Sequence, residues 1–247
     1  MIQRRFSIAS AALLALCLST VCLAQTAAPP AHQRVIIVHV KPDMQTEWFD
    51  LQKNELMPAQ KKGGLVSRTT YQTMYGNIYE YITVTPFSKY AEFDSESPLT
   101  HALGAQGAAR LLAKLAKCTD SRQDFVSSPL PQLSNMTDGP PPPMGVFSRR
   151  RVAEGRMQDY ENFVKNELVP IYKKANVRYT VVRRGLGANS NDVTSITSFT
   201  KMADIDGGNP ITRALGPEGA AKLLMKANGI STQVESLVRR RVPELSY

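Results

Sequence analysis

Apolar and polar positions along the chain repeat with two periods, one typical of strands and one typical of helices. The run Arg34–Val40 is rich in β-branched residues, which indicates a strand. In Asp43–Lys62, and again further along the chain, apolar side chains recur at helical spacing. The later apolar stripe comprises Tyr160, Phe163, Val164, Leu168 and Ile171. The pattern therefore predicts a strand followed by an amphipathic helix.

The next segments complete a small α+β unit. Two strands are predicted at Leu65–Met74 and Ile78–Thr85, separated by a short polar turn. The pair Ser97-Pro98 is typical of a helix start, because serine caps the first turn and proline fits its first position. A last strand covers Gln123–Ser128. The predicted order is β-α-β-β-α-β, the ferredoxin-like split unit.

The chain contains an internal duplication. Pro58 recurs as Pro170 and Gly104 as Gly216, and every matching block has the same offset of 112 residues. The matching blocks are KNELMPAQKK and KNELVPIYKK (53–62 and 165–174), SPLTHALGAQGAARLLAK and NPITRALGPEGAAKLLMK (97–114 and 209–226), and PQLS and PELS (131–134 and 243–246). Three registered matches are not a chance result, so we predict the same element order twice.

The duplication divides the chain into five predicted segments. They are a signal peptide (1–24), a flexible N-terminal segment (25–33), a first ferredoxin-like repeat (34–134), a proline-rich linker (135–145) and a second ferredoxin-like repeat (146–247). The linker sequence NMTDGPPPPMG predicts a stiff, extended connector. Pro58 and Pro170 lie inside the first helix of each repeat and are expected to kink or end it.

The topology, together with NELxP and SPLxxALGxxGAAxLL, resembles the dimeric α/β-barrel superfamily. That superfamily includes the antibiotic-biosynthesis monooxygenases, and the motifs look most like those of NIPSNAP-type and stress-responsive A/B-barrel proteins. The resemblance implies an α+β fold, with two β-α-β-β-α-β units packed sheet to sheet as an intramolecular α/β barrel. A fused tandem would be a one-chain version of the dimer that relatives form. We therefore expect a monomer or a weak homodimer.

The N-terminus is typical of an exported protein. Arg4 and Arg5 precede the apolar run Ala11–Ala24, and the small residues at its end predict cleavage between Ala24 and Gln25. The alternative is an uncleaved anchor, although the run is short for a membrane span. We expect a periplasmic or secreted protein with no integral membrane association after cleavage. Cys118 would then be the single cysteine, so no intrachain disulfide could form, and we expect it to be buried.

With a formal net charge of +9, an exported protein could bind anionic small molecules, lipid head groups or acidic polymers. Nucleic acid is not expected, because no nucleic-acid-binding motif is present. Two arginine triplets, 149–151 and 239–241, fall in the first and last strands of the second repeat. These strands are adjacent in the split unit, so the triplets are expected to be neighbours. Strand alternation sends four of their side chains toward the barrel interior or its mouth. The four are Arg149, Arg151, Arg239 and Arg241.

Two interpretations of these arginines remain open. The first is a salt-bridge network in which first-repeat carboxylates, such as Glu80 and Asp124, supply the counter-charges. The second is a site for a carboxylate or phosphate ligand, which guanidinium groups bind in a bidentate manner. Tyr79 and Tyr81 share a predicted strand and could line such a pocket.

Candidate catalytic residues are few. His39 lies in a strand on the predicted interior face, and His101 lies in the first turn of the second helix. The resemblance implies that a histidine near His101 can act on substrate or bind haem in enzymes of this fold. His32 falls in the predicted N-terminal linker. The sequence contains no HExxH, CxxC or phosphate-binding loop, so we assign no metal and no cofactor.

Glu55 and Glu167 occupy matching places beside the apolar stripe of each repeat. A buried carboxylate could act as a general base. The alternative, which we favour, is an ion pair, for example between Glu167 and Arg150. Three functions follow from these patterns: small-molecule binding, which we favour, a cofactor-independent monooxygenase or isomerase, and an interaction module with a basic face.

Overall fold

The computed structural model describes residues 32–247, so the predicted signal peptide and residues 25–31 lie outside the described part. The strands are β1 (His32–Val40), β2 (Thr69–Thr73), β3 (Glu80–Phe87), β4 (Thr119–Pro129), β5 (Met144–Val152), β6 (Tyr179–Arg184), β7 (Asp192–Phe199) and β8 (Ser231–Arg241). The helices are α1 (Gln45–Asp50), α2 (Met57–Lys62), α3 (Pro98–Lys117), α4 (Met157–Phe163), α5 (Val169–Lys174) and α6 (Pro210–Asn228).

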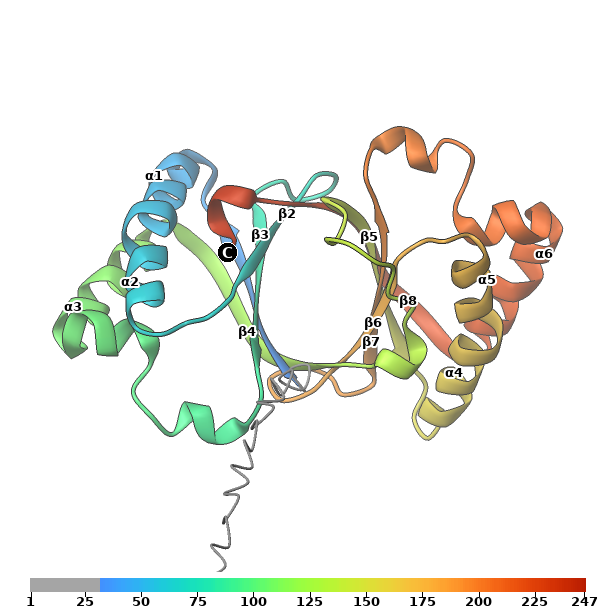
Figure 1. Cartoon of the computed structure of the whole chain (residues 1–247), viewed down its shortest axis with the longest axis horizontal. Coiled ribbons are helices and arrows are strands. Elements are labelled where there is room, and N and C mark those ends of the chain that lie inside the picture. Colours follow the sequence, from blue (N-terminus) through green and yellow to red (C-terminus); the bar gives the residue numbers. More distant parts are fainter. Residues whose placement is uncertain (1–31) are drawn as a thin grey trace, which may run out of the picture.

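All of these strands form one closed antiparallel barrel in the order β1-β3-β2-β8-β5-β7-β6-β4 (Figure 1). The first half of the described chain contributes the run β4-β1-β3-β2, and the second half contributes β8-β5-β7-β6. Two short seams, β2–β8 and β4–β6, join the halves by backbone hydrogen bonds. The two sheets therefore meet edge to edge. The prediction that they pack face to face is wrong. Edge pairing satisfies backbone groups that a face-to-face sandwich would leave open.

The helices lie outside the barrel, with α1–α3 against the first half and α4–α6 against the second (Figure 1). Each half therefore has a hydrophobic core between its strands and its helices. One core contains Trp48, Leu111 and Leu115, and the other contains Tyr160, Phe163 and Val164. A third, smaller cluster around Val35, Ile82 and Phe125 fills part of the barrel.

The first helix of each half continues through its proline. A π-helical segment, Leu51–Leu56 or Val164–Leu168, joins the two α-helical parts. The amide of Met57 donates to the carbonyl of Gln52, five residues back, and Val169 does the same to Val164. The wider turn accommodates a ring that has no N–H to donate. The helix widens at these prolines, so the expected helix end there is wrong.

Two other local expectations have different outcomes. Gly104 and Gly216 interrupt α3 and α6 as predicted, with φ of 67° and 70°, a conformation that glycine adopts without a Cβ clash. His32, in contrast, already belongs to β1, and its ring bonds the Ser128 hydroxyl at 3.0 Å. His32 is paired with Phe87 of β3, and Gln33 is paired with both β3 and β4.

The repeated PQLS and PELS blocks tie the two halves together. Each follows the last strand of its half and forms a short 3-10 turn at Pro131–Leu133 or Pro243–Leu245. Leu133 is buried in the helix-side core of the second half, and Leu245 is buried in that of the first. Each half thus contributes one leucine to the other's core. Within residues 32–247, no helix is long and apolar enough to cross a bilayer.

Candidate functional site

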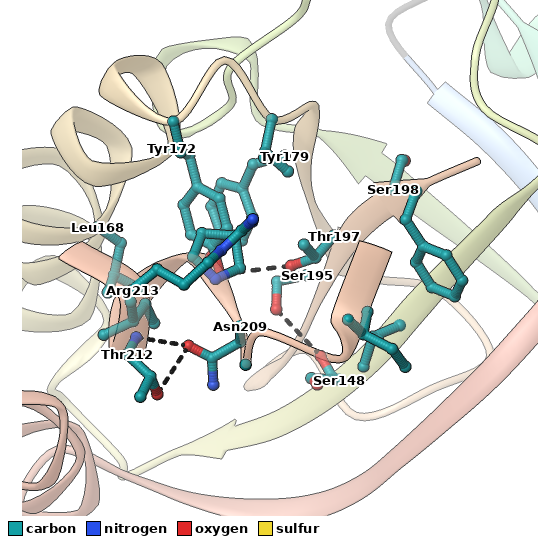
Figure 2. Close-up of a pocket in the computed structure, with 18 of the residues that line it drawn as sticks. Ser148, Leu168, Tyr172, Tyr179, Ser195, Thr197, Ser198, Asn209, Thr212 and Arg213 are labelled. Atoms are coloured by element: carbon teal, nitrogen blue, oxygen red, sulfur yellow. Dashed lines mark hydrogen bonds between the residues drawn. The ribbon is translucent and has the colours of Figure 1, made fainter. Parts of the chain in front are cut away.

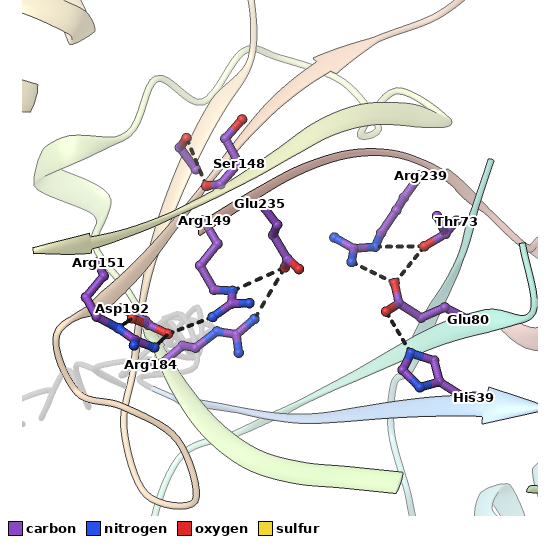
Figure 3. Close-up of polar contacts among 11 residues, drawn as sticks. His39, Thr73, Glu80, Ser148, Arg149, Arg151, Arg184, Asp192, Glu235 and Arg239 are labelled. Carbon is purple, nitrogen blue, oxygen red and sulfur yellow. Dashed lines mark hydrogen bonds and ion pairs between the residues drawn. The ribbon is translucent and has the colours of Figure 1, made fainter. Parts of the chain in front are cut away.

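The two arginine triplets are not neighbours, which corrects the sequence prediction. β5 and β8 do pair, but the register sets Arg149 opposite Glu235 and Arg239 opposite Gly145. Both triplets lie near the C-terminal ends of their strands. Because the strands are antiparallel, those ends point in opposite directions. The triplets therefore contribute to two separate polar clusters (Figure 3).

The first cluster is centred on Arg239, which is buried inside the barrel with 2% of its surface exposed. Its Nη2 donates to Glu80 Oε1 at 2.8 Å, and its Nε donates to Thr73 Oγ1 at 3.3 Å. His39 Nε2 lies 3.1 Å from Glu80 Oε2. Burial opposes ionisation of Glu80, but these hydrogen bonds outweigh it and hold its pKa below the ordinary value. Glu80 is the counter-charge that the salt-bridge interpretation expects.

The second cluster surrounds Asp192, whose side chain is 3% exposed. Arg149 Nη1 donates to Asp192 Oδ2 at 2.9 Å and Arg149 Nε to Glu235 Oε1 at 3.2 Å, while Arg151 Nε donates to Asp192 Oδ1 at 2.7 Å. Burial would raise the pKa of Asp192, but the two guanidinium groups keep it lowered. The counter-charges here come from the second half. The expectation that Asp124 supplies them is wrong, because that carboxylate binds Arg34 and Arg122 instead.

The predicted tyrosines lie elsewhere. Tyr81 faces the helices, where its ring centroid is 4.4 Å from that of Trp48 and its hydroxyl accepts from Gln45. Tyr79 lies in the turn before β3. The aromatic residue that does face the interior is Tyr71, which meets Phe147 edge to face and pairs across the seam with Arg241. The predicted interior position of Tyr81 is therefore wrong, since the strand alternates in the opposite sense.

The two candidate histidines remain apart. His39 faces the barrel interior as expected and bonds both Ser121 and Glu80. His101 is exposed on α3, outside the barrel. Cys118 is free and fully buried, and burial raises the pKa of its thiol. Among residues 32–247, no cluster of histidine, cysteine and carboxylate side chains has the composition of a metal site.

Both stripe glutamates form ion pairs, but with lysines. Glu55 Oε2 lies 2.9 Å from Lys114 Nζ, and Glu167 pairs in the same way with Lys226. These pairs join the first and second helices within each half. Arg150, the expected partner of Glu167, instead binds Ser231 and Asn228. The ion-pair interpretation is confirmed, and the named partner is wrong.

The second half contains a cavity of about 750 Å³ that sequence reasoning missed. This cleft lies between the outer face of the strands and helices α4–α6, opposite to the barrel interior (Figure 2). Its aromatic lining consists of Tyr160, Phe163, Tyr172, Tyr179 and Phe199. Its polar lining includes Ser148, Ser195, Thr197, Gln233 and Ser236 from the strands and Asn209, Thr212 and Arg213 from the start of α6.

The tyrosines of the cleft form a rigid wall. The rings of Tyr172 and Tyr179 stack with centroids 4.0 Å apart and an interplanar angle of 6°. Thr197 Oγ1 donates to the Tyr172 hydroxyl at 3.3 Å (Figure 2). Burial raises the pKa of Tyr160 to about 12, and that of Tyr179 is raised as well. At neutral pH these phenols are therefore protonated and can donate hydrogen bonds.

A comparison of the two halves explains why the cleft exists. At the matching positions the first half has Ile36, Val38, Tyr81 and Leu115, of which Val38, Tyr81 and Leu115 pack in the core between strands and helices. The second half has smaller or polar residues there, namely Ser148, Arg150, Val193 and Ala227. Tyr81 and Leu115 are 3% and 8% exposed, so the first half uses that volume for core packing. The duplicated sequence shows this change at these four positions, although Tyr172 and Tyr179 replace Gln60 and Ser67 elsewhere in the cleft lining.

The rim of the cleft carries positive charge. Arg213 and Arg178 both line it, at positions where the first half has His101 and Val66. Arg178 is held by a hydrogen bond to the Gly139 carbonyl at 3.2 Å. Asp204, also on the rim, is the acidic group nearest to Arg213 in the cleft lining. The cleft thus combines aromatic side chains and strand hydroxyl groups in its interior with guanidinium groups at its mouth.

The comparisons with known proteins show the fold. The sequence matches no protein-family model and no curated protein. An anthrone oxidase-like protein superposes with a TM-score of 0.58 at 11% identity, covering 86% of this chain and 92% of its own. A candidate monooxygenase from Fusobacterium nucleatum superposes with a TM-score of 0.55 at 10% identity, covering 87% of this chain and 92% of its own. A mutant chlorite dismutase from Candidatus Nitrospira defluvii, in complex with cyanide, superposes with a TM-score of 0.52 at 8% identity. It covers 88% of this chain and 93% of its own. The chain therefore shares its α/β-barrel fold with these proteins.

Proposed function

We propose that this protein binds a small molecule in the second-half cleft. The observation that carries the proposal is the asymmetry between the halves: the first fills the strand–helix space with Tyr81 and Leu115, whereas the second leaves about 750 Å³. A volume of this size fits one small organic ligand. The stacked tyrosines favour a flat apolar body, and Arg213 and Arg178 at the rim favour an anionic end.

The proposal includes the wider setting of the cleft. The two halves are a tandem of ferredoxin-like units of the NIPSNAP or A/B-barrel type, in which both copies have a hydrophobic core and the second copy also holds the ligand. The mature protein acts outside the cytoplasm, after cleavage between Ala24 and Gln25. Amino-terminal sequencing of the protein secreted by its native host tests this location, and an intact Met1 would refute it.

A fluorescence titration tests ligand binding. The naphthalene sulfonate dye ANS is flat, aromatic and anionic, so it should bind the folded protein with one-to-one stoichiometry. Ala227→Phe places a ring inside the cleft and should abolish the signal. Ala113→Phe, on the exposed face of α3, is the matched control and should leave it unchanged. Equal dye binding by both variants would refute the cleft as the site. Native mass spectrometry of protein from its own host would then identify the natural ligand.

A second candidate function is cofactor-independent oxygenation of a ligand held in the same cleft. It is favoured by the fold shared with an anthrone oxidase-like protein and with a candidate monooxygenase. The direct test supplies anthrone and O₂, which would give anthraquinone and water in equal amounts. Turnover above the buffer rate that is lost in Ala227→Phe supports this function. ANS binding without turnover leaves the binding proposal standing and removes this candidate for anthrone-like substrates.

A further inference from the structure

A different site lies inside the barrel, at the seam where β4 meets β6. Ser127 and Arg184 are directly paired across this seam. Their exposed fractions are 1% and 9%, so both side chains are at least nine-tenths buried. Ser127 Oγ and Arg184 Nε have no hydrogen-bond partner within the described part of the chain. Buried polar groups are nearly always bonded, and two adjacent exceptions call for a ligand that accepts from both.

The charges around Arg184 are unbalanced. Its nearest carboxylate is Glu235, whose Oε1 lies 4.0 Å from Arg184 Nη2 but accepts from Arg149 Nε at 3.2 Å. Asp192 is occupied by Arg149 and Arg151. Burial and the nearby guanidinium of Arg149 lower the pKa of Arg184 to about 10, so it still carries its charge at neutral pH. Among residues 32–247, Arg184 is thus a buried cation whose one carboxylate partner within 4.0 Å, Glu235, is shared with Arg149.

The opposite seam shows what a balanced arrangement looks like. There Arg239 is also buried, but its Nη2 donates a hydrogen bond to Glu80 Oε1 at 2.8 Å and its Nε donates one to Thr73 Oγ1 at 3.3 Å. The counterpart of Glu80 in the second half is Asp192, which the triplet arginines hold instead. At the β4–β6 seam, Arg184 is buried as Arg239 is, but no carboxylate is dedicated to pairing with it. Figure 3 shows Arg184 beside Arg149 and apart from the Glu80 cluster.

We propose that a small monovalent anion, chloride or a one-carbon carboxylate, binds in the barrel between Arg184 and Ser127. The Arg184 Nε–H and the Ser127 hydroxyl both donate to it, and it neutralises the uncompensated guanidinium. The Phe125 ring covers one face of that guanidinium at 4.5 Å, so the anion approaches Nε–H in the guanidinium plane. Because Ser127 and Arg184 are both buried, the site favours an ion as small as a halide or formate. This site stabilises the closed barrel, is independent of the cleft, and requires no residue that lines the cleft.

Thermal unfolding of the full chain tests the proposal with sodium chloride, bromide or formate against sodium gluconate, at equal ionic strength and pH 7. Gluconate is too large for the seam. An anion present at about 100 times its Kd raises the folded-to-unfolded ratio about 100-fold, so we expect Tm to rise by about 5 °C or more over gluconate. Arg184→Gln should abolish this difference. Arg183→Gln is the matched control, because its guanidinium bonds the Ser190 carbonyl instead.

A second measurement protects the test against a variant that fails to fold. Crystals of the unmodified protein grown in bromide should show an anomalous peak in contact with Arg184 Nε and Ser127 Oγ, and Ser127→Ala should weaken the bromide-dependent Tm shift. The proposal is overturned if Tm is the same in all salts, if the shift persists in Arg184→Gln, or if bromide lies only at the exposed Arg151. If only water occupies the seam, Tm should be the same in all salts, which is the first of these outcomes.

Discussion

Replacing Ala227 by leucine would test the origin of the cleft directly. The first half has Leu115 at the matching position, 8% exposed in a packed core, whereas Ala227 lines the cavity and is itself 7% exposed. Because Ala227 lines the cavity of about 750 Å³, we expect the three added carbons to occupy part of that volume. At about 0.8 kcal/mol per buried methylene group, the free energy of unfolding should rise by about 2 kcal/mol. Alanine and leucine are both strong helix formers, so propensity contributes little.

Urea unfolding followed by far-ultraviolet circular dichroism measures this change. The matched control is Ala113→Leu, at an exposed position of α3, where the free energy of unfolding should change by no more than about 0.5 kcal/mol. A loss of about 1–3 kcal/mol in Ala227→Leu, as overpacking causes, would refute the reasoning. It would mean that α6 packs against its strands as tightly as α3 does. Weaker ANS binding by the same variant would link the filled volume to the ligand site.

Three further predictions concern polar and backbone features. Glu80→Gln leaves the Arg239 charge buried and unpaired, which should cost about 3–5 kcal/mol at pH 7 by urea unfolding. Because the folded pKa of Glu80 lies below its ordinary 4.5, its contribution is present above that pH and is lost as the pH falls further, so variant and parent should converge in acid. Gly187→Ala should cost about 2–3 kcal/mol in the same assay, because φ is 83° and a Cβ would lie 2.6 Å from the Asp124 carbonyl. Lys226→Met removes an exposed ion pair and should cost no more than about 1 kcal/mol.

Each of these predictions has a result that contradicts it. A Glu80→Gln variant whose deficit is unchanged at pH 3 would show that the carboxylate charge does not stabilise Arg239. Gly139 has the same φ of 83° but no atom within 4 Å of an added Cβ, so Gly139→Ala is the control for close approach. Equal costs at the two glycines would show that backbone strain alone matters. A loss above 2 kcal/mol for Lys226→Met would show that the pair is more than a surface contact.

Much of the architecture could be predicted because it depends on local patterns. Strand and helix periods, the capping pair Ser97-Pro98 and the glycine interruptions at Gly104 and Gly216 act over a few residues, and the structure shows each of them. The inward direction of Arg149 and Arg239 also followed from alternation within one strand. Of the two outcomes expected at Pro58 and Pro170, a kink or a helix end, the end was wrong, because a π-turn relieves the missing N–H and the helix continues.

The candidate sites required information that no local pattern contains. Which arginine meets which carboxylate depends on antiparallel register and on closure of the two seams, and these placed Glu235 opposite Arg149 and Arg184 opposite Ser127. The cleft depends on volume, which is a property of several elements packed together. Periodicity and duplication specified the elements and their order, because backbone geometry repeats over short distances. Only the closed barrel decided which charges are paired and where space remains, because pairing and packing join residues that are far apart along the chain.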